Sequence, residues 1–278
     1  AKNPTGRGVS ELFVTPPERE RRYFPVRSRM NKAFLLLERS ARLAEPLIPT
    51  SIRRHATRKA VDWFTERLNT THGLGAIFPA MVNAFEAYLI LGTDPDDPRL
   101  RQARQALKDL VVREAEEAWC QPCVSPVWDT ALAALALAET GNGADLAAAK
   151  RGLEWLRPRQ LLDFQGDWSE TRPELRGGGW PFQYENPHYP DLDDTAVVAY
   201  AMRKIDPENF RESIDRAVEW LQGMQSENGG FASFEIDNTR DYLNEIPFAD
   251  HGALLDPPTA DVSARCAMLF GSLGKNRR

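Results

Sequence analysis

The chain is 278 residues long, with 42% hydrophobic and 27% charged residues and a formal net charge of −5. These values allow a sizeable core in one large domain or in parts of two, and they exclude an intrinsically disordered chain. No apolar run approaches the roughly 18 residues that a membrane-spanning helix requires, and three cysteines are too few for a disulfide framework. The chain does not begin with Met and neither end carries a targeting signal, so we expect it to be part of a longer protein.

The N-terminal segment, residues 1–60, is basic: it holds 14 Lys and Arg against 5 Asp and Glu, whereas the remainder holds 21 against 35. The basic residues surround apolar stretches at 33–37 and 47–49 and lack interleaved aromatic rings that could stack on bases. This pattern favours an anionic membrane surface over nucleic acid, and we predict no nucleic-acid partner. A solvated charged face explains the pattern equally well.

One amphipathic helix occurs three times, at 59–64, 151–156 and 216–221, each time with Trp as the fifth residue. Two of the copies continue to a Gln, Gln160 or Gln225, and then to a turn of the form Gly-x-aromatic. The first copy has a Leu where this Gln is expected. Repeats at spacings of tens of residues are typical of stacked helical units.

A second type of helix alternates with the first and is apolar on all sides. Such helices open at Pro79, Pro126, Pro190 and Pro258 and close near Gly92, Gly141 and Gly271. Pro near the start and Gly past the end are ordinary helix punctuation, and a helix that is apolar all round is a buried one. The alternation predicts an all-α protein, an α/α barrel with the buried helices as its inner ring. Four pairs do not close a ring of six, so we expect the barrel to be incomplete in this chain.

The cysteines and histidines do not predict a metal site. Cys120 and Cys123 form a Cys-x-x-Cys pair with only Cys266 left to join it, so four thiolates cannot be assembled. The histidines show no metal-ligand spacing among themselves; they are His55, His72, His188 and His251. We therefore expect no metal.

A domain boundary is predicted within residues 120–126. The block before it is more basic and its repeats are degenerate, whereas the clearest repeats follow it. This divides the chain into residues 1–122 and 123–278.

Three of the apolar helices carry an Asp at the third position after their Pro: Asp129, Asp193 and Asp261. If the outer helices return the chain, the inner helices run parallel, and the three carboxylates gather at one end of the cavity. Capping of helix N-termini explains one such Asp easily and three converging ones less well.

The second of these residues belongs to the run Asp191-Leu192-Asp193-Asp194-Thr195, which has three carboxylates in four residues. Crowded carboxylates cannot all ionise near neutral pH, so one stays protonated, as a general acid must be. The preceding residues, 177–190, are rich in aromatic rings. An acid beside aromatic walls suits cation chemistry on hydrocarbons, although Asp and Thr also simply cap helices.

These motifs resemble those of the squalene–hopene cyclases, class II triterpene cyclases that fold polyprenes by protonating a terminal double bond. The resemblance covers nearly the whole chain and rests on residues 125–133, 178–198, 223–241 and 246–265, and the helix repeats are similar to the QW motifs of that family. It implies that the first part of the chain is the C-terminal portion of the membrane-facing barrel. The second part is then the N-terminal portion of the catalytic barrel.

The resemblance implies that Asp193 is the proton donor and that Asp191 and Asp194 support its protonation state. Arg265 occupies the position where the best-known members carry a His. Because Arg cannot relay a proton, it could only stabilise the carboxylate electrostatically, and reprotonation would run through water or another group. A simple ion pair with Asp261, one helical turn earlier, explains Arg265 as well.

Five further residues match the family's site. Asp129 and Asp261 correspond to two carboxylates near the acid, which we assign to its hydrogen-bond and water network, with helix capping as the alternative. Trp128, Phe182 and Phe234 fall on positions that line the family's cavity, where ring faces stabilise carbocations. Without the resemblance, each of these aromatic residues would be assigned to the core.

Phe248 and His251 lie in a segment, 246–252, that resembles the constriction through which substrate enters in the family. A loop packed against the barrel explains these two residues equally well. The family is monotopic in membranes and usually dimeric. The resemblance therefore implies squalene as the substrate, a homodimer, and a peripheral position on the cytoplasmic face of a bacterial inner membrane.

The predicted function is that of a squalene–hopene cyclase: acid-initiated, metal-free polycyclisation of squalene to hopene or hopanol, without a cofactor. One alternative is a related class II cyclase with another prenyl substrate. A second is a carbohydrate-active α/α barrel, which needs a wet and polar cleft. A third is a helical-repeat scaffold without catalysis. We expect the isolated chain to be inactive, because an unclosed barrel exposes apolar helix faces.

Overall fold

The structure is a computed structural model. It describes residues 26–69, 72–247 and 254–274, together with Phe13, Val14, Pro16, Arg19 and Phe24. Among these residues the regular structure is helical apart from two short antiparallel ribbons, β1–β2 and β3–β4. The all-α class predicted from the sequence is confirmed.

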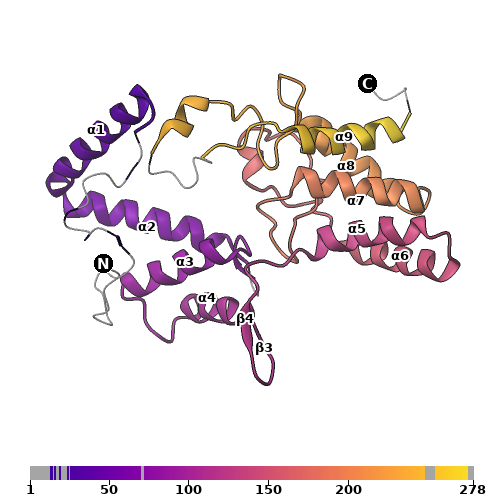
Figure 1. The fold of residues 1–278 in the computed structure, drawn as a ribbon, viewed down its shortest axis with the longest axis horizontal. Helices are drawn as coiled ribbons and strands as arrows, with labels where there is room; N and C mark the ends of the chain where they lie inside the picture. Colours follow the sequence, from indigo (N-terminus) through magenta and orange to yellow (C-terminus); the bar gives the residue numbers. More distant parts are fainter. Residues whose placement is uncertain are drawn as a thin grey trace.

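The N-terminal part occupies one end of the molecule (Figure 1). In chain order its elements are α1 (Arg29–Ala44), η3 (Glu45–Leu47), α2 (Thr50–Glu66), β1 (Leu68–Asn69), β2 (Gly73–Leu74), α3 (Phe78–Ile90), α4 (Pro98–Asp109), β3 (Val111–Arg113) and β4 (Ala118–Cys120). The helices α3 and α4 pack against each other. Tyr88 of α3 and Leu100 of α4 are buried in a small cluster that Val61 and Phe64 of α2 partly cover.

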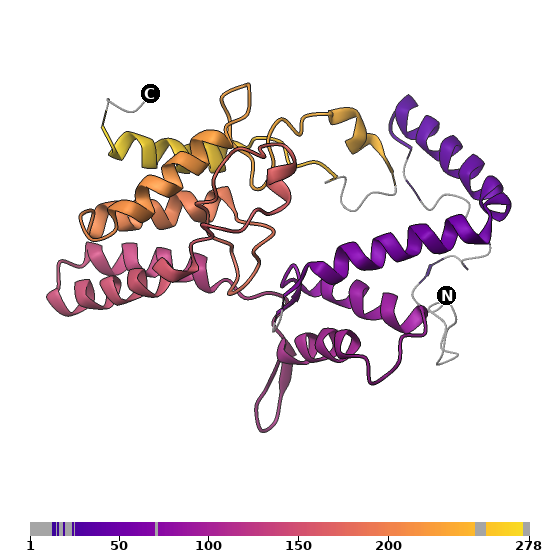
Figure 2. The same cartoon turned by 180° about the vertical axis from the view of Figure 1, so that it is seen from behind.

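The C-terminal part holds the larger core. Its elements are α5 (Pro126–Glu139), α6 (Gly143–Leu156), η4 (Arg157–Arg159), η5 (Asp167–Glu170), α7 (Leu192–Ile205), α8 (Arg211–Gly223), η6 (Asp241–Glu245) and α9 (Ala260–Ser272). The helix α7 packs against α5 on one side and α9 on the other, and the three run in the same direction (Figure 1). The helix α6 packs against α5, and α8 against α7. Figure 2 shows the same arrangement from behind. The layer of inner helices therefore places its N-termini at one end.

The repeated Gln and the neighbouring Trp join α6 to α8. Gln160 Nε2 donates to the Gly178 carbonyl at 2.8 Å and to the Ser213 carbonyl, in α8, at 2.9 Å. Trp180 Nε1 donates to the Leu156 carbonyl, at the end of α6, at 2.7 Å. Buried amide and indole groups are stable only with such partners. The other repeated Gln makes a different contact, because Gln225 Nε2 donates to the Gly229 carbonyl at 2.8 Å, four residues later in the chain.

The prediction that inner helices are buried on all sides holds for α7 and is wrong for α3, α5 and α9. Nine residues of α7 are buried, against three in each of the others. Leu132 of α5 and Met268 of α9 are 41% and 42% exposed. The helix α7 lies between two inner helices, whereas α5 and α9 form the edges of the layer. Each edge helix therefore keeps one apolar face without a neighbour among the described residues.

The helices α1 and α2 are mostly exposed. Asn31 is the single buried residue of α1, and α2 has none. Leu36, Leu37 and Leu43 of α1 are 66%, 64% and 81% exposed. The apolar stretch noted in the basic segment thus lies on an exposed helical surface. No helix in the described part of the chain is long and apolar enough to cross a bilayer.

Candidate active site

The first turn of α7 is built on Asp191, its N-cap. One carboxylate oxygen of Asp191 accepts the backbone N–H of Asp193 at 2.7 Å and that of Asp194 at 3.2 Å. A carboxylate in this position satisfies free N–H groups and interacts favourably with the helix dipole. The capping role that the sequence left open therefore applies to Asp191, whereas Asp193 and Asp194 lie within the first turn.

An extended segment that ends in Trp180 fixes this N-terminus. The Trp180 carbonyl accepts the Asp191 N–H at 2.8 Å, and the Trp180 N–H donates to Thr195 Oγ1 at 2.9 Å. The Thr195 hydroxyl donates in turn to the Asp191 carbonyl at 2.6 Å. A Cβ on Gly178 would lie 2.3 Å from the Arg216 carbonyl oxygen, so only glycine lets the segment approach α8 this closely. The Gly-Gly-Trp sequence thus holds the acidic run against the core.

The three carboxylates of the run differ in exposure. Asp194 is 1% exposed and Asp191 is 8% exposed, whereas 20% of the Asp193 side chain is accessible. A group that gives a proton to a substrate must be reached by that substrate. Exposure therefore separates Asp193 from its two neighbours as the carboxyl that a substrate could reach.

Burial raises the pKa of all three carboxyls. The pKa of Asp194 rises to about 9, first through burial and then through the charges of Asp191, Asp193 and Asp129. Burial raises the pKa of Asp191 to about 7, although the two backbone N–H groups that it caps lower it. Burial also raises the pKa of Asp193, against the lowering effect of Arg265. The run therefore retains protons near neutral pH, and its members titrate together.

Arg265 of α9 lies between two carboxylates. Its Nη1 is 2.8 Å from each carboxylate oxygen of Asp193 and 4.0 Å from Asp261 Oδ2. Its guanidinium carbon is 5.2 Å from the centroid of the Trp128 ring, within the range of a cation–π contact. Of the two partners that the sequence left open for Arg265, Asp193 is the closer.

Asp129 and Asp261 lie at the same end of the inner layer and are both exposed. Asp129 Oδ2 accepts the Ser125 hydroxyl at 2.8 Å, and its charge contributes to the raised pKa of Asp194. The side chain of Asp261 is 70% exposed. A hydrogen bond from the Thr259 side chain is the largest cause of the lowered pKa of Asp261. These two carboxylates therefore form an outer rim around the buried run.

The predicted cavity aromatics come from three segments. Trp128, half-buried in α5, is linked to Asp193 through Arg265. Phe234 is 37% exposed and packs edge-on against Tyr189, with 6.2 Å between ring centroids. Phe182 is half-buried in the segment that leads to the run. Phe248 and His251, predicted at the substrate entrance, lie outside the described residues.

Cys266 is a buried neighbour of the acidic run. Burial and, after it, the charges of Asp193 and Asp191 raise the pKa of this thiol to about 12. Cys266 is therefore a neutral core residue, whereas Cys120 is exposed on β4. Within the part of the chain that the structure describes, no three His, Cys, Asp or Glu side chains are grouped so that they could hold a metal ion.

Asp256 is a residue near the site that the sequence analysis missed. Its carboxylate accepts the backbone N–H of Ser233 at 3.1 Å, of Phe234 at 2.7 Å and of Glu235 at 3.0 Å. The Ser233 carbonyl in turn accepts the N–H of Leu192, in the first turn of α7, at 2.9 Å. Asp256 thus holds the loop with Phe234 against the first turn of α7. In the sequence, Asp256 is marked only by the two prolines that follow it, whereas its hydrogen-bond partners lie 21 to 23 residues earlier in the chain.

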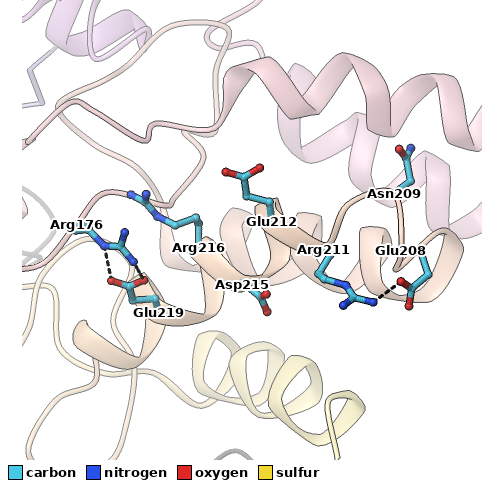
Figure 3. A pocket seen from close by; sticks show the side chains of 8 residues that line it. All are labelled: Arg176, Glu208, Asn209, Arg211, Glu212, Asp215, Arg216 and Glu219. Atoms are coloured by element: carbon cyan, nitrogen blue, oxygen red, sulfur yellow. Dashed lines mark hydrogen bonds and ion pairs between the residues drawn. The ribbon is translucent and has the colours of Figure 1, made fainter.

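A surface cleft of about 500 Å³ runs along α8 (Figure 3). It is lined by polar and charged side chains: Arg176, Glu208, Asn209, Arg211, Glu212, Asp215, Arg216 and Glu219. Arg176 pairs with Glu219 and Arg211 with Glu208, all at exposed positions. Exposed pairs of this kind contribute little. The cleft contains none of the predicted site residues, and we assign it no role.

Residues 1–116 match the family model of the squalene-hopene cyclase N-terminal domain, and residues 124–278 match that of the squalene-hopene cyclase C-terminal domain. The boundary predicted after residue 122 lies between the two matches; the barrel to which each part belongs stays a prediction.

Among the curated proteins, the chain is 47% identical to the squalene–hopene cyclase of Bradyrhizobium diazoefficiens, over 100% of its own length and 43% of that relative. It is 45% identical to that of Zymomonas mobilis, over 99% of its length and 43% of the relative. It is 38% identical to that of Alicyclobacillus acidocaldarius, over 96% and 42%. The chain thus spans less than half the length of the curated relatives it matches. With the two domain matches, these similarities establish that the chain belongs to the squalene–hopene cyclase family.

Proposed function

We propose that the protein containing this chain is an acid-initiated cyclase that converts squalene to hopene or hopanol. The observation that carries the proposal is Asp193, the accessible carboxyl of a buried acidic run, held at 2.8 Å by Arg265. Identity of 45–47% to squalene–hopene cyclases supports squalene as the substrate.

The reaction starts with proton transfer from Asp193 to a terminal double bond. The O–H bond of the carboxylic acid breaks, one alkene carbon gains the proton, and the other carbon becomes a cation. Negative charge then develops on Asp193 beside the Arg265 guanidinium. Arg265 stabilises this carboxylate more than the neutral acid, so it lowers the barrier to proton transfer.

Ring closure follows as each double bond of the folded chain attacks the cation before it. The faces of Trp128, Phe182 and Phe234 stabilise these cations without lone pairs that would trap them. Loss of a proton ends the sequence with an alkene, and capture of water ends it with an alcohol. Because a carboxyl supplies the proton, the chemistry needs no metal and no cofactor.

Reprotonation of Asp193 has to bypass Arg265, which has donors but no acceptor and stays charged. Asp261 and Asp129 lie on the exposed rim, where water reaches them. We assign these two carboxylates to a water-filled path that returns a proton to Asp193. Their exposure supports this assignment.

The protein is further proposed to lie on the cytoplasmic face of a bacterial inner membrane as a peripheral homodimer. The exposed leucines of α1 and the basic residues around them support contact with anionic lipid. The homodimer rests on the family resemblance. Phe248 and His251 are assigned to the substrate entrance on the same basis.

The test uses the complete open reading frame that encodes this chain, incubated with squalene in detergent, with products identified by gas chromatography–mass spectrometry. We expect pentacyclic C30 products from the wild type, and a loss of roughly a thousandfold in Asp193→Asn with thermal unfolding unchanged. Asp109→Asn, at an exposed position of α4, is the matched control and should retain activity. Activity that survives in Asp193→Asn would overturn the assignment of the acid. No product from folded, membrane-bound wild type would overturn squalene as the substrate and point to another prenyl chain.

A further inference from the structure

Arg67, Asp167 and Tyr189 form a connected set of hydrogen bonds, which we name the junction triad. Arg67 Nη2 donates to Asp167 Oδ1 at 2.6 Å and Arg67 Nε donates to Asp167 Oδ2 at 3.1 Å. The Tyr189 hydroxyl donates to Asp167 Oδ2 at 2.6 Å. Arg67 lies in the part matched by the N-terminal family model, and the other two lie in the part matched by the C-terminal one. The triad therefore ties the two parts of the chain together.

The Arg67–Asp167 ion pair is shielded from solvent and has a defined geometry. The two side chains are 11% and 20% exposed, whereas those of the surface pair Arg176–Glu219 are 63% and 40% exposed. A two-pronged Arg–carboxylate contact defines direction as well as distance. Arg67 is further held by Trp63, because Nη1 donates to the Trp63 carbonyl at 2.9 Å and the guanidinium carbon lies 4.0 Å from the ring centroid. Arg67 thus presents one fixed geometry at the end of α2.

Asp167 also contacts the segment that leads to the acid through its backbone. The Asp167 N–H donates to the His188 carbonyl at 3.1 Å, and His188 Nδ1 lies 3.5 Å from Asp167 Oδ1. A Cβ on Gly166 would lie 2.3 Å from the His188 carbonyl oxygen, so this approach requires glycine. Asp167 is therefore hydrogen-bonded to two successive residues, His188 and Tyr189.

Tyr189 lies two residues before Asp191, the cap of α7, with only Pro190 between them. Proline fixes its own backbone angle φ, so a displacement of Tyr189 is passed on to the cap. The Tyr189 ring also packs against Phe234, a predicted cavity residue, at 6.2 Å. The Tyr189 hydroxyl thus contacts Asp167, and its ring contacts a predicted cavity residue.

Near neutral pH, the protonation states of Asp167 and Tyr189 favour the hydrogen bonds of the junction triad. Burial would raise the pKa of Asp167, but hydrogen bonds from Arg67 and Tyr189 hold it below its ordinary value. Burial, and then the bond to Asp167, raise the pKa of Tyr189 to about 12. Asp167 therefore remains an acceptor and Tyr189 remains a donor.

We propose that Arg67 and Asp167 are positioning residues for the acid, acting through Tyr189 to set where the first turn of α7 and Phe234 lie relative to the N-terminal part. This inference rests on the proposed function, because the acid matters only if Asp193 donates a proton. It adds a role for an N-terminal residue that has no contact with the acidic run itself.

The experiment compares variants of the protein expressed from the complete open reading frame. We expect Arg67→Gln, Asp167→Asn and Tyr189→Phe each to lower kcat for squalene at least tenfold while KM changes less than twofold, measured well below the unfolding temperature. The double variant Arg67→Gln/Asp167→Asn should be no worse than the worse single one, because both remove the same link. Arg67→Lys should recover only part of the loss, since ammonium lacks the two-pronged geometry. Arg176→Gln, which breaks an exposed pair, is the matched control and should keep kcat.

Hydrogen exchange of the peptide that covers residues 186–197 gives a second readout that is independent of turnover. Protection is expected to fall in Arg67→Gln and Asp167→Asn and to stay unchanged in Arg176→Gln. A lowered unfolding temperature with kcat within twofold of wild type, or unchanged exchange of this peptide, would overturn the inference. Tyr189→Phe keeps the ring and removes only the hydroxyl, so it serves if the other variants fail to fold. A wild type without squalene turnover counts against the proposed function instead, and the exchange data then decide the link.

Discussion

A single nitrogen of Arg265, Nη1, lies 2.8 Å from both carboxylate oxygens of Asp193, a residue 72 positions earlier in the chain. The contact joins α9 to α7 across the inner layer. It places a permanent positive charge beside the Asp193 carboxylate. The contact between Arg265 and Asp261, by comparison, is longer and lies at the exposed rim.

This geometry predicts unequal effects of two substitutions. Arg265→Gln should lower kcat by about tenfold or more, because loss of the guanidinium raises the pKa of Asp193 and makes it a weaker acid. Asp261→Asn should change kcat less than Arg265→Gln does, since its side chain is 70% exposed and solvent screens its charge. Steady-state kinetics with squalene measure both. A loss in Asp261→Asn as large as that in Arg265→Gln would contradict this ordering.

The raised pKa of Asp194 predicts how the free energy of unfolding depends on pH. Its pKa is 3.8 when unfolded and about 9 when folded, so between these values the folded protein holds a proton that the unfolded chain has lost. The free energy of unfolding therefore falls as pH rises through this window, and the contribution is fully present below the unfolded pKa. We expect the unfolding temperature of Asp194→Asn to fall less than that of wild type between about pH 5 and pH 8. Parallel falls in the two proteins would contradict the raised pKa of Asp194.

Turnover should also depend on pH in a defined direction. The acidic run must be protonated to act, and the pKa of Asp191 is raised to about 7 by burial. Deprotonation of Asp191 places a negative charge near Asp193 and makes Asp193 a weaker acid, so we expect kcat to fall as pH rises through about 7. A rate profile measured in buffers of constant ionic strength checks this. A rate that stays constant to well above the pKa of Asp194 would argue against a carboxyl donor in this run.

Because Gly178 lies close to the backbone of α8, a methyl group added at this position should destabilise the protein. Gly178→Ala would bring a Cβ to 2.3 Å from the Arg216 carbonyl oxygen, so we expect a loss of about 1–3 kcal/mol of stability and a displaced acidic run. Gly143→Ala, in the first turn of α6, has no atom within 4 Å of the new Cβ and is the control. It should be neutral or stabilise by up to about 1 kcal/mol. Denaturant unfolding of both variants measures the difference.

The sequence predicted where the inner helices α3, α5, α7 and α9 begin, whereas α1 and α4 were not predicted. Pro126 stands at the first position of α5, and Pro190 and Pro258 come two residues before α7 and α9. These features depend on residues close together in the chain, which local periodicity and helix punctuation record. The acidic run could be found for the same reason, because its three carboxylates crowd one another within four residues.

Which side chains meet and which are buried depends on the tertiary structure. The partners of Arg265, Asp256 and Arg67 lie tens of residues away, and nothing in the local pattern of the sequence selects among the candidates. Burial was mispredicted for α5 and α9 because it depends on the neighbours of a helix, and these two are the edges of the layer. The three carboxylates of the run likewise differ through their tertiary surroundings. Asp191 caps α7 and Asp194 is enclosed in the core. Asp193 stays partly accessible and contacts Arg265 of α9.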